Sequence, residues 1–498
     1  MGEDEGSSKP ILGGLQSFEW GFLACLISPF LACDYTSFSQ QVCLFQEMNG
    51  CLNQKMVVIC TNLGSRRTME KASTPDQRGM ARFLVLVVVS VAMFGNYYIY
   101  DSVSPLADVL KTQLSFSDKQ IGLLNAIYSI PNIFMVLVGG IIVDKIGTRL
   151  ATLVFTFLCA LGAGVTASSS NFIVMASGRL IFGLGAESMI VAVTTAIAKW
   201  FRGKELSFAF GLNLTLARLG SFAALNSPSW AKPLYSNWQM PLLLATLFGL
   251  IALVGALMYF MVEKKMEGYL ARAEERSSES VKFQDLFTFS GSFWLVVALC
   301  VTFYSGIFPF QTFAIKFFMH KHGVSREEAG FLSSMLTLFA MICTPIFGFV
   351  VDQIGRRSLF MMFGSLLLMP VYLMLAHTNI SLYVPMAMMG IAFSLVPAIM
   401  WPSVAYIVGQ EKLGTAYGLM TMLQNIGLAL FNIAIGAIND AFGASEDNPS
   451  GYDKGMWVFS ALGYFAFLFA FLLWRRERGP NAHGLETITA RSKKAEQT

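Results

Sequence analysis

The chain has 498 residues, of which 55% are hydrophobic and 13% are charged, with a net charge of +4 and a mean hydropathy of +0.57. A soluble globular domain of this length would not tolerate so apolar a surface, so we predict a polytopic membrane protein. The basic residues fall in short loops and in the tail rather than on one face, so we expect no nucleic-acid partner.

Residues 1–80 differ from the rest of the chain. The apolar stretch at 19–32 is too short to cross a bilayer and contains Pro29. We interpret residues 1–80 as an N-terminal extension, either disordered or an artefact of the gene model, with Met69 and Met80 as alternative starts.

From Arg82 onward, apolar runs of about twenty residues alternate with short polar loops, a pattern typical of spanning helices. We predict an all-α membrane protein with twelve transmembrane helices in two six-helix halves. The helices are expected at 83–106, 119–142, 150–168, 172–198, 206–227, 241–262, 292–316, 329–350, 358–376, 381–408, 413–438 and 455–474. The N-terminal half is then 81–262 and the C-terminal half 291–475, joined by a cytoplasmic linker at 263–290 and followed by a cytoplasmic tail at 476–498.

The distribution of lysine and arginine predicts the orientation in the membrane. These residues accumulate in the loops after the even-numbered helices and in the tail, whereas the loops after helices three and nine carry none. Because basic loops stay in the cytoplasm, we expect both termini to be cytoplasmic. Lys316, Lys321 and Arg326 on the opposite side weaken this contrast.

An internal repeat of the pattern G-x-x-x-D-x-x-G-x-R marks the ends of helices two and eight. Its two copies, offset by 208 residues, comprise Gly140, Asp144, Gly147 and Arg149 in the first and Gly348, Asp352, Gly355 and Arg357 in the second. We call residues 140–149 and 348–357 the motif loops. The glycines are expected to let helices approach closely, and the arginine to pair across its loop. The repeat predicts two homologous halves with a breakable latch that gates their movement.

Two opposite charges, Glu187 and Arg218, interrupt otherwise apolar helices four and five. Each lies fifteen to sixteen residues from the centre of the polar loop 199–205, so both are expected about 20 Å from the turn, near the bilayer midplane. Charges at that depth normally serve function. Arg218 suits a carboxylate and Glu187 an ammonium group, as in an amino acid or a dipeptide. A structural ion pair between helices four and five is the alternative.

A third charge, Arg179, lies two helical turns outward of Glu187. It is a candidate relay for a proton or a substrate, and a structural role on backbone carbonyls is equally open.

The repeat, together with twelve helices, resembles the major facilitator superfamily. Within it, the chain is similar to the lysosomal dipeptide transporter family of major facilitator superfamily domain-containing protein 1 and to its bacterial relatives. The matching stretches are NYYIYDS at 96–102, GRLIFGLGAES at 178–188, WFRGKELSFAFGLNLTLARLGS at 200–221, FPF at 308–310, WPSVAYIV at 401–408 and LGTAYGLMTMLQNIGLA at 413–429.

The resemblance implies facilitated movement of dipeptides, with Glu187 and Arg218 as substrate ligands. Helices one, four, seven and ten line the cavity in this superfamily, which adds Tyr97, Tyr304 and Trp401 to the expected substrate-binding residues. The lipid bilayer is the other expected partner, together with an accessory membrane subunit if the protein is lysosomal. No acidic residue stands at the proper distance before Ile11-Leu12 to form a sorting signal, so a cell (inner or plasma) membrane is favoured over a lysosomal one.

The sequence offers little for metal or covalent chemistry. Its eight cysteines form no C-x-x-C pair, its four histidines form no H-E-x-x-H pattern, and no nucleophile–base pair is visible. We expect no metal, no cofactor and no enzymatic activity. The predicted function is transport of a small zwitterionic solute, first of all a dipeptide, by alternating access. Uniport is favoured, because Arg218 would keep Glu187 ionised. Proton-coupled transport of another small organic solute, and a non-transporting receptor or subunit, are the alternatives.

Overall fold

A computed structural model describes residues 75–201, 206–266, 289–409, 412–480 and 482–487. The predicted N-terminal extension and linker therefore lie mostly outside the described residues. Within these ranges the N-terminal half contains α2 (Pro75–Asp101), η1 (Ser104–Leu106), α3 (Ala107–Leu114), α4 (Asp118–Ala126), α5 (Ser129–Ile146), α6 (Thr148–Ser168), α7 (Phe172–Trp200), α8 (Leu206–Leu225), α9 (Ser227–Trp230), η2 (Lys232–Ser236) and α10 (Gln239–Lys265). The C-terminal half contains α12 (Gly291–His322), α13 (Arg326–Ile354), α14 (Arg357–Leu368), α15 (Val371–His377), α16 (Tyr383–Ile407), α17 (Leu413–Ala441), η6 (Pro449–Tyr452) and α18 (Asp453–Arg476).

These helices confirm the predicted all-α fold with twelve spans. Eleven described segments are long and apolar enough to cross a membrane, and the pair 118–136 and 138–146, bent by 55°, brings the number to twelve if it is counted as one span. Four of the described helices, α4, α7, α12 and α13, begin at a side-chain cap. Ser117 and Gln120 form a capping box at the start of α4, and Ser325 caps α13.

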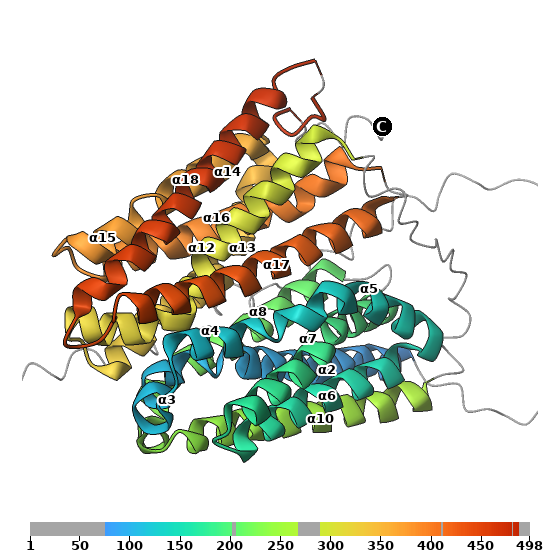
Figure 1. The fold of residues 1–498 in the computed structure, drawn as a ribbon. Helices are drawn as coiled ribbons and strands as arrows, with labels where there is room; N and C mark the ends of the chain where they lie inside the picture. Colours follow the sequence, from blue (N-terminus) through green and yellow to red (C-terminus); the bar gives the residue numbers. More distant parts are fainter. Residues whose placement is uncertain (1–74, 202–205, 267–288, 410–411, 481, 488–498) are drawn as a thin grey trace, which may run out of the picture. The chain divides into compact units, whose positions relative to one another are not determined.

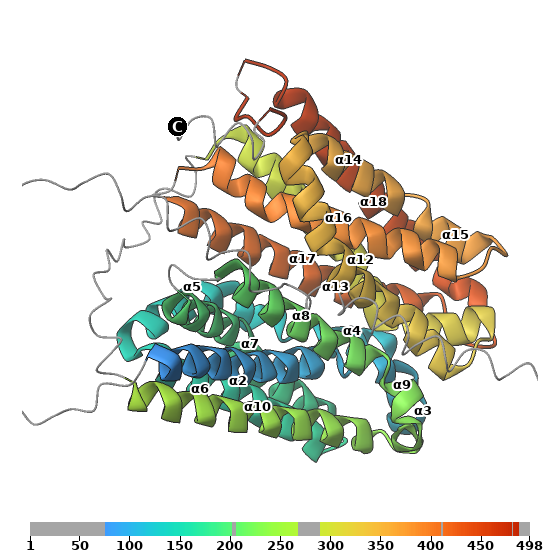
Figure 2. The ribbon, with the colours of Figure 1, turned by 180° about the vertical axis from the view of Figure 1, so that it is seen from behind.

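Each half packs mainly on itself. In the N-terminal half α6 lies against α7 and α2 against α8 and α10, while in the C-terminal half α12 lies against α18 and α13 against α16. Between the halves, α17 contacts α4 and α5, and α13 contacts α8. Figure 1 shows these contacts along the seam between the blue-to-green and the yellow-to-red helices, and Figure 2 shows α8 facing α13 from behind.

The motif loops end α5 and α13 with a glycine in the left-handed region of φ. Gly147 has φ of 80° and Gly355 of 73°, which other residues adopt only with strain. The expected pairing across the second loop is present, since Arg357 binds Asp352 at 2.9 Å. The expected close approach is not made here, because nothing lies within 4 Å of a Cβ built on Gly140 or Gly348.

Buried charges join the halves at the end of the bundle opposite the motif loops, which we call the distal end. Lys316 of α12 binds Asp118 of α4, with Nζ 2.6 Å from Oδ2, and both side chains are fully buried. Asp440 of α17 accepts hydrogen bonds from the backbone N–H groups of Asp118 and Lys119 at 2.7 and 2.8 Å. Backbones approach closely here, since a Cβ on Gly436 would lie 2.3 Å from the Asp118 carbonyl oxygen.

Further ion pairs at the distal end explain why basic residues occur on the side expected to carry few of them. Arg326 of α13 binds Asp108 of α3, with Nη1 2.8 Å from Oδ1. Lys321 binds Asp453 at 2.8 Å. The basic residues that weakened the orientation signal are therefore each paired with an aspartate. Apolar packing follows the same plan, because the buried cluster that fills the C-terminal half continues into residues 103–124 of the N-terminal half.

The segment after α18 packs back onto the second motif loop. The backbone N–H of Arg357 donates to the Leu485 carbonyl at 3.0 Å, and that of Ser358 donates to the Glu486 carboxylate at 3.0 Å. Leu485 itself is fully buried. Glu477 holds this segment by accepting from the backbone N–H of His483 at 2.8 Å. The described part of the tail, which we call the return segment (477–487), thus belongs to the folded C-terminal half.

Candidate functional site

A cavity of about 100 Å³ lies between the halves at the middle of the bundle. Helices α2, α7 and α8 line it from one half and α12, α13, α16 and α17 from the other. Its polar lining includes two acids, one arginine and three amide side chains, namely Asp101, Glu187, Arg218, Asn96, Gln311 and Gln424. Because both halves contribute to its wall, movement of one half against the other changes the cavity.

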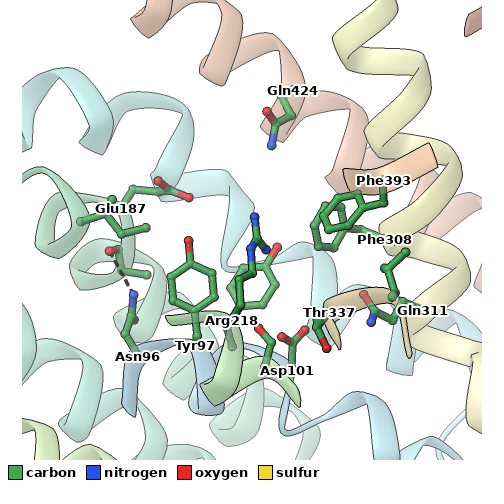
Figure 3. Close-up of a pocket in the computed structure, with 15 residues that line it drawn as sticks. Asn96, Tyr97, Asp101, Glu187, Arg218, Phe308, Gln311, Thr337, Phe393 and Gln424 are labelled. Carbon is green, nitrogen blue, oxygen red and sulfur yellow. Dashed lines mark hydrogen bonds between the residues drawn. The ribbon is translucent and has the colours of Figure 1, made fainter. Parts of the chain in front are cut away.

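Glu187 and Arg218 both line this cavity, as the sequence predicts, but they do not pair with each other. Among the described residues, neither side chain makes a hydrogen bond or an ion pair. Figure 3 shows the Glu187 carboxylate above the Tyr97 hydroxyl and the Arg218 guanidinium to the right of the Tyr97 ring. The acid and the base are held apart in one space, where a ligand with two opposite charges could contact both.

Aromatic rings hold the Arg218 guanidinium between the halves. Its central carbon lies 5.8 Å from the ring centroid of Tyr97 on α2 and 5.4 Å from that of Phe393 on α16. Phe393 also packs edge to face against Phe308 of α12, with centroids 5.6 Å apart. Ring faces attract a cation without neutralising it, so the guanidinium keeps its hydrogen-bond donors for a ligand.

Arg179 does not line the cavity but binds backbone carbonyls behind its wall. It is 1% exposed and donates to the carbonyls of Ile99 and Tyr100 at 3.0 and 3.1 Å, and to that of Leu124 at 3.3 Å. Two of these carbonyls belong to the last turn of α2, which ends at Asp101 and so leaves carbonyls without helical partners. This geometry is the structural role that the sequence left open for Arg179, and it positions the end of α2.

Asp101 is a lining residue that was not among the expected substrate-binding residues. Asp101 is 6% exposed, and its carboxylate lies beside the Ser221 hydroxyl of α8 and within electrostatic range of Arg218 and Arg179. It follows the tyrosines of the first matching stretch, at the point where α2 stops. A second acid directly after Tyr100 was a readable signal, because charges near the bilayer centre are rare.

Tyr304 and Trp401 line a second cavity that adjoins the first. Its volume is about 370 Å³, and Arg218 and Phe393 form part of the wall of both cavities. Trp401 donates its indole N–H to the Tyr304 hydroxyl at 3.0 Å. Of the three aromatic residues expected at the substrate, Tyr97 therefore lies at the charged cavity, and Tyr304 and Trp401 lie at its neighbour.

Phe393 and Thr337 are further lining residues that sequence reasoning did not find. Phe393, Pro397 and Trp401 recur every fourth residue on α16, so a stripe through the proline-containing helix was the available signal. For Thr337 on α13 the sequence offered no comparable signal. Within the described residues, no group of three His, Cys, Asp or Glu side chains is placed to hold a metal ion.

The family model described as Major Facilitator Superfamily matches residues 89–315 and 310–496. The chain belongs to the major facilitator superfamily. It is therefore a membrane transporter and not an enzyme, and the resemblance noted in the sequence is confirmed.

Curated relatives include two named lysosomal dipeptide transporter MFSD1. The one from Danio rerio is 34% identical over 378 residues, and the one from Homo sapiens is 32% identical over the same length. Each alignment covers 73% of this chain and 81% of the relative. The solved structure of the nucleoside transporter NupG is 15% identical with a TM-score of 0.65, covering 78% of this chain and 99% of that one, which shows a shared fold.

Proposed function

We propose that this transporter carries dipeptides by alternating access, as a uniporter. The observation that carries the proposal is the pair of Glu187 and Arg218, which line one cavity without binding each other. A planar guanidinium matches a carboxylate, and a carboxylate accepts hydrogen bonds from an ammonium group. A dipeptide carries both groups at its two ends, and the relatives named above are dipeptide transporters by name.

The alternative role for the two charges is to fasten α7 to α8. A lone charge in a membrane costs about 2.5–3.5 kcal/mol on insertion scales, so residues kept for fastening would be expected to bind each other directly. Arg218 instead lies between Tyr97 and Phe393. The separation of Glu187 and Arg218 therefore favours a ligand whose charged groups bind them.

Alternating access is supported by the closed distal end. The hydrogen bonds and ion pairs described between the halves gather there, around Asp118, Lys316 and Arg326. Releasing the solute on that side would require these contacts to break, while residues from both halves stay at the cavity. The motif loops then act at the opposite end, which the charge pattern of the sequence predicts to be cytoplasmic.

The proposed transporter resides in the lysosomal membrane and moves its substrate without proton coupling. The relatives named as lysosomal transporters support the lysosomal membrane, the alternative to the cell membrane that the sequence favoured. Fluorescence microscopy of the tagged full-length chain against a lysosomal marker decides between the two. Uniport predicts that net dipeptide flux down its own gradient moves no protons, whereas a dipeptide gradient that drives a pH change inside the proteoliposomes would show proton coupling.

The site is tested by uptake and binding with protein purified into proteoliposomes. Glu187→Gln is expected to weaken the binding of a free dipeptide by about 1.5–3 kcal/mol, the range of a charge-assisted hydrogen bond. This corresponds to a roughly 10- to 150-fold increase in Kd. The same dipeptide with an acetylated amino group lacks the ammonium, so its affinity should be nearly unchanged by the substitution.

Arg218→Lys is the matched variant for the other end of the ligand. It keeps the charge but loses the bidentate hydrogen bonding of the guanidinium, so it should weaken the binding of both free and acetylated dipeptides. If both variants fold and bind both ligands as the wild type does, Glu187 and Arg218 do not form the substrate site.

A further inference from the structure

The second cavity, which Tyr304 and Trp401 line, differs in composition from the charged cavity. Of the described residues that line it, Arg218 alone is charged, and the rest of the wall includes Leu214, Met341 and Trp401. At about 370 Å³ it is larger than the charged cavity of about 100 Å³.

The aromatic wall of this cavity is apolar in character. Trp401 and Tyr304 satisfy each other through the indole N–H and the hydroxyl, at 3.0 Å. Tyr304 also stacks on Phe308, with centroids 5.6 Å apart and ring planes 9° from parallel. Because the polar atoms of Tyr304 and Trp401 are paired with each other, their rings remain as surface for apolar groups.

The position of Arg218 fixes which part of a dipeptide reaches this cavity. A carboxylate held by the guanidinium stands at the border between the two cavities, since Arg218 lines both. The C-terminal side chain branches one atom away from that carboxylate. The N-terminal Cα lies about 3.8 Å further along the backbone, toward Glu187 and the smaller polar cavity.

We propose that the cavity around Tyr304 and Trp401 is the subsite for the C-terminal side chain, and that the protein selects dipeptides with a large apolar or aromatic C-terminal residue. This inference rests on the proposed dipeptide function. It makes recognition depend on residue order, because the N-terminal side chain stays beside Asp101, Gln311 and Gln424 in the smaller cavity.

The first test compares Ala-Phe, Phe-Ala and Ala-Ala binding to wild-type protein by isothermal titration or by competition for uptake. Ala-Phe is expected to bind about 10- to 100-fold more tightly than Phe-Ala, from burial of one phenyl ring. Equal affinity of Ala-Phe and Phe-Ala would overturn the subsite.

Two variants then locate the effect. Met341→Trp fills the cavity, so it should reduce the affinity for Ala-Phe about tenfold or more while leaving that for Ala-Ala within about twofold. Trp401→Ala removes part of the wall, so it should reduce the affinity for Ala-Phe by a larger factor than that for Ala-Ala. Trp457→Ala, on a side chain 52% exposed on α18, is the control for loss of a tryptophan and should change neither affinity. Equal losses for Ala-Phe and Ala-Ala would overturn the subsite, because they show a general effect on the site or on the fold.

The design separates this inference from the function on which it rests. If Ala-Ala binds and responds to Glu187→Gln but residue order has no effect, the dipeptide function stands and the subsite is wrong. If none of the three dipeptides binds, the proposed function and the subsite are both wrong.

Discussion

The buried pair of Lys316 and Asp118 allows a quantitative prediction about the distal end. Both side chains are 0% exposed, and they belong to opposite halves. Lys316→Met keeps the length of the side chain but leaves the Asp118 carboxylate buried without its main partner. Removing one member of a buried pair costs about 3–5 kcal/mol, whereas the wider separation of an open distal end would let water reach the acid. The cost therefore falls on the closed conformation.

Lys111 reduces this cost. Its Nζ lies 3.4 Å from the same carboxylate, with 31% of the side chain exposed, so it gives partial compensation. We expect the lower end of the range, about 3 kcal/mol, which is roughly a 150-fold shift toward the distal-open conformation. A population that is about 99% closed in the wild type would then become close to half open.

The assay is a spin-label distance between the distal ends of the halves, with labels at Gln113 and Glu446 in a cysteine-free background. Both positions are exposed. Lys316→Met should add a longer distance to the distribution. The double variant with Asp118→Asn should largely restore the closed distance, because it removes the stranded charge as well as the cation.

The control is the exposed pair of Lys232 and Glu327, which also joins the halves. Its side chains are 73% and 28% exposed, so Lys232→Met should shift the equilibrium by less than about 1 kcal/mol. Similar effects of Lys232→Met and Lys316→Met would refute the argument from burial. So would a double variant at Asp118 and Lys316 whose effect equals the sum of the single ones.

Three more predictions concern the motif loops, the return segment and Arg179. Asp144→Asn and Asp352→Asn should each change the uptake rate several-fold while leaving dipeptide Kd within about twofold, since the substrate lies about 20 Å away; equal losses in affinity would show that they do not gate. Leu485→Asp should lower the free energy of unfolding by about 1–3 kcal/mol in thermal or denaturant melts, because it places a charge at a fully buried position, and an unchanged melt would mean that the segment is not docked. Arg179→Gln should destabilise the protein by about 3 kcal/mol or more, because two or three buried carbonyls lose a charged donor, whereas a residue acting only as a relay would leave the melt unchanged.

Much of the architecture could be predicted because the bilayer restricts what a sequence can do. Apolar runs of fixed length predicted the twelve spans, and the rarity of charges at mid-depth selected Glu187 and Arg218 from the sequence alone. The same rule applied to Asp101, but the helix that carries it was expected to continue to residue 106, whereas α2 ends at Asp101 itself. The charge of Asp101 was visible in the sequence, but the position at which the helix ends was not.

What could not be predicted depends on contacts between distant parts of the chain. Lys316 blurred the orientation signal in the sequence, and its partner Asp118 stands 198 residues away. The division of Tyr97 and Trp401 between two cavities depends on how the halves pack in one conformation. The return segment is short and polar and has no helical periodicity, so nothing local announced that Leu485 would be buried.

The two motif loops are fastened in chemically different ways. In the N-terminal half Glu263, at the end of the spanning helix α10, accepts from Thr148 at 3.0 Å and binds Lys199 at 3.1 Å. In the C-terminal half the fastening is done by the return segment, a peptide of eleven residues outside any spanning helix. The return segment is therefore a part of this fastening that can be removed without interrupting a spanning helix, whereas Glu263 belongs to one. The two halves thus repeat the motif but differ in the kind of element that holds it.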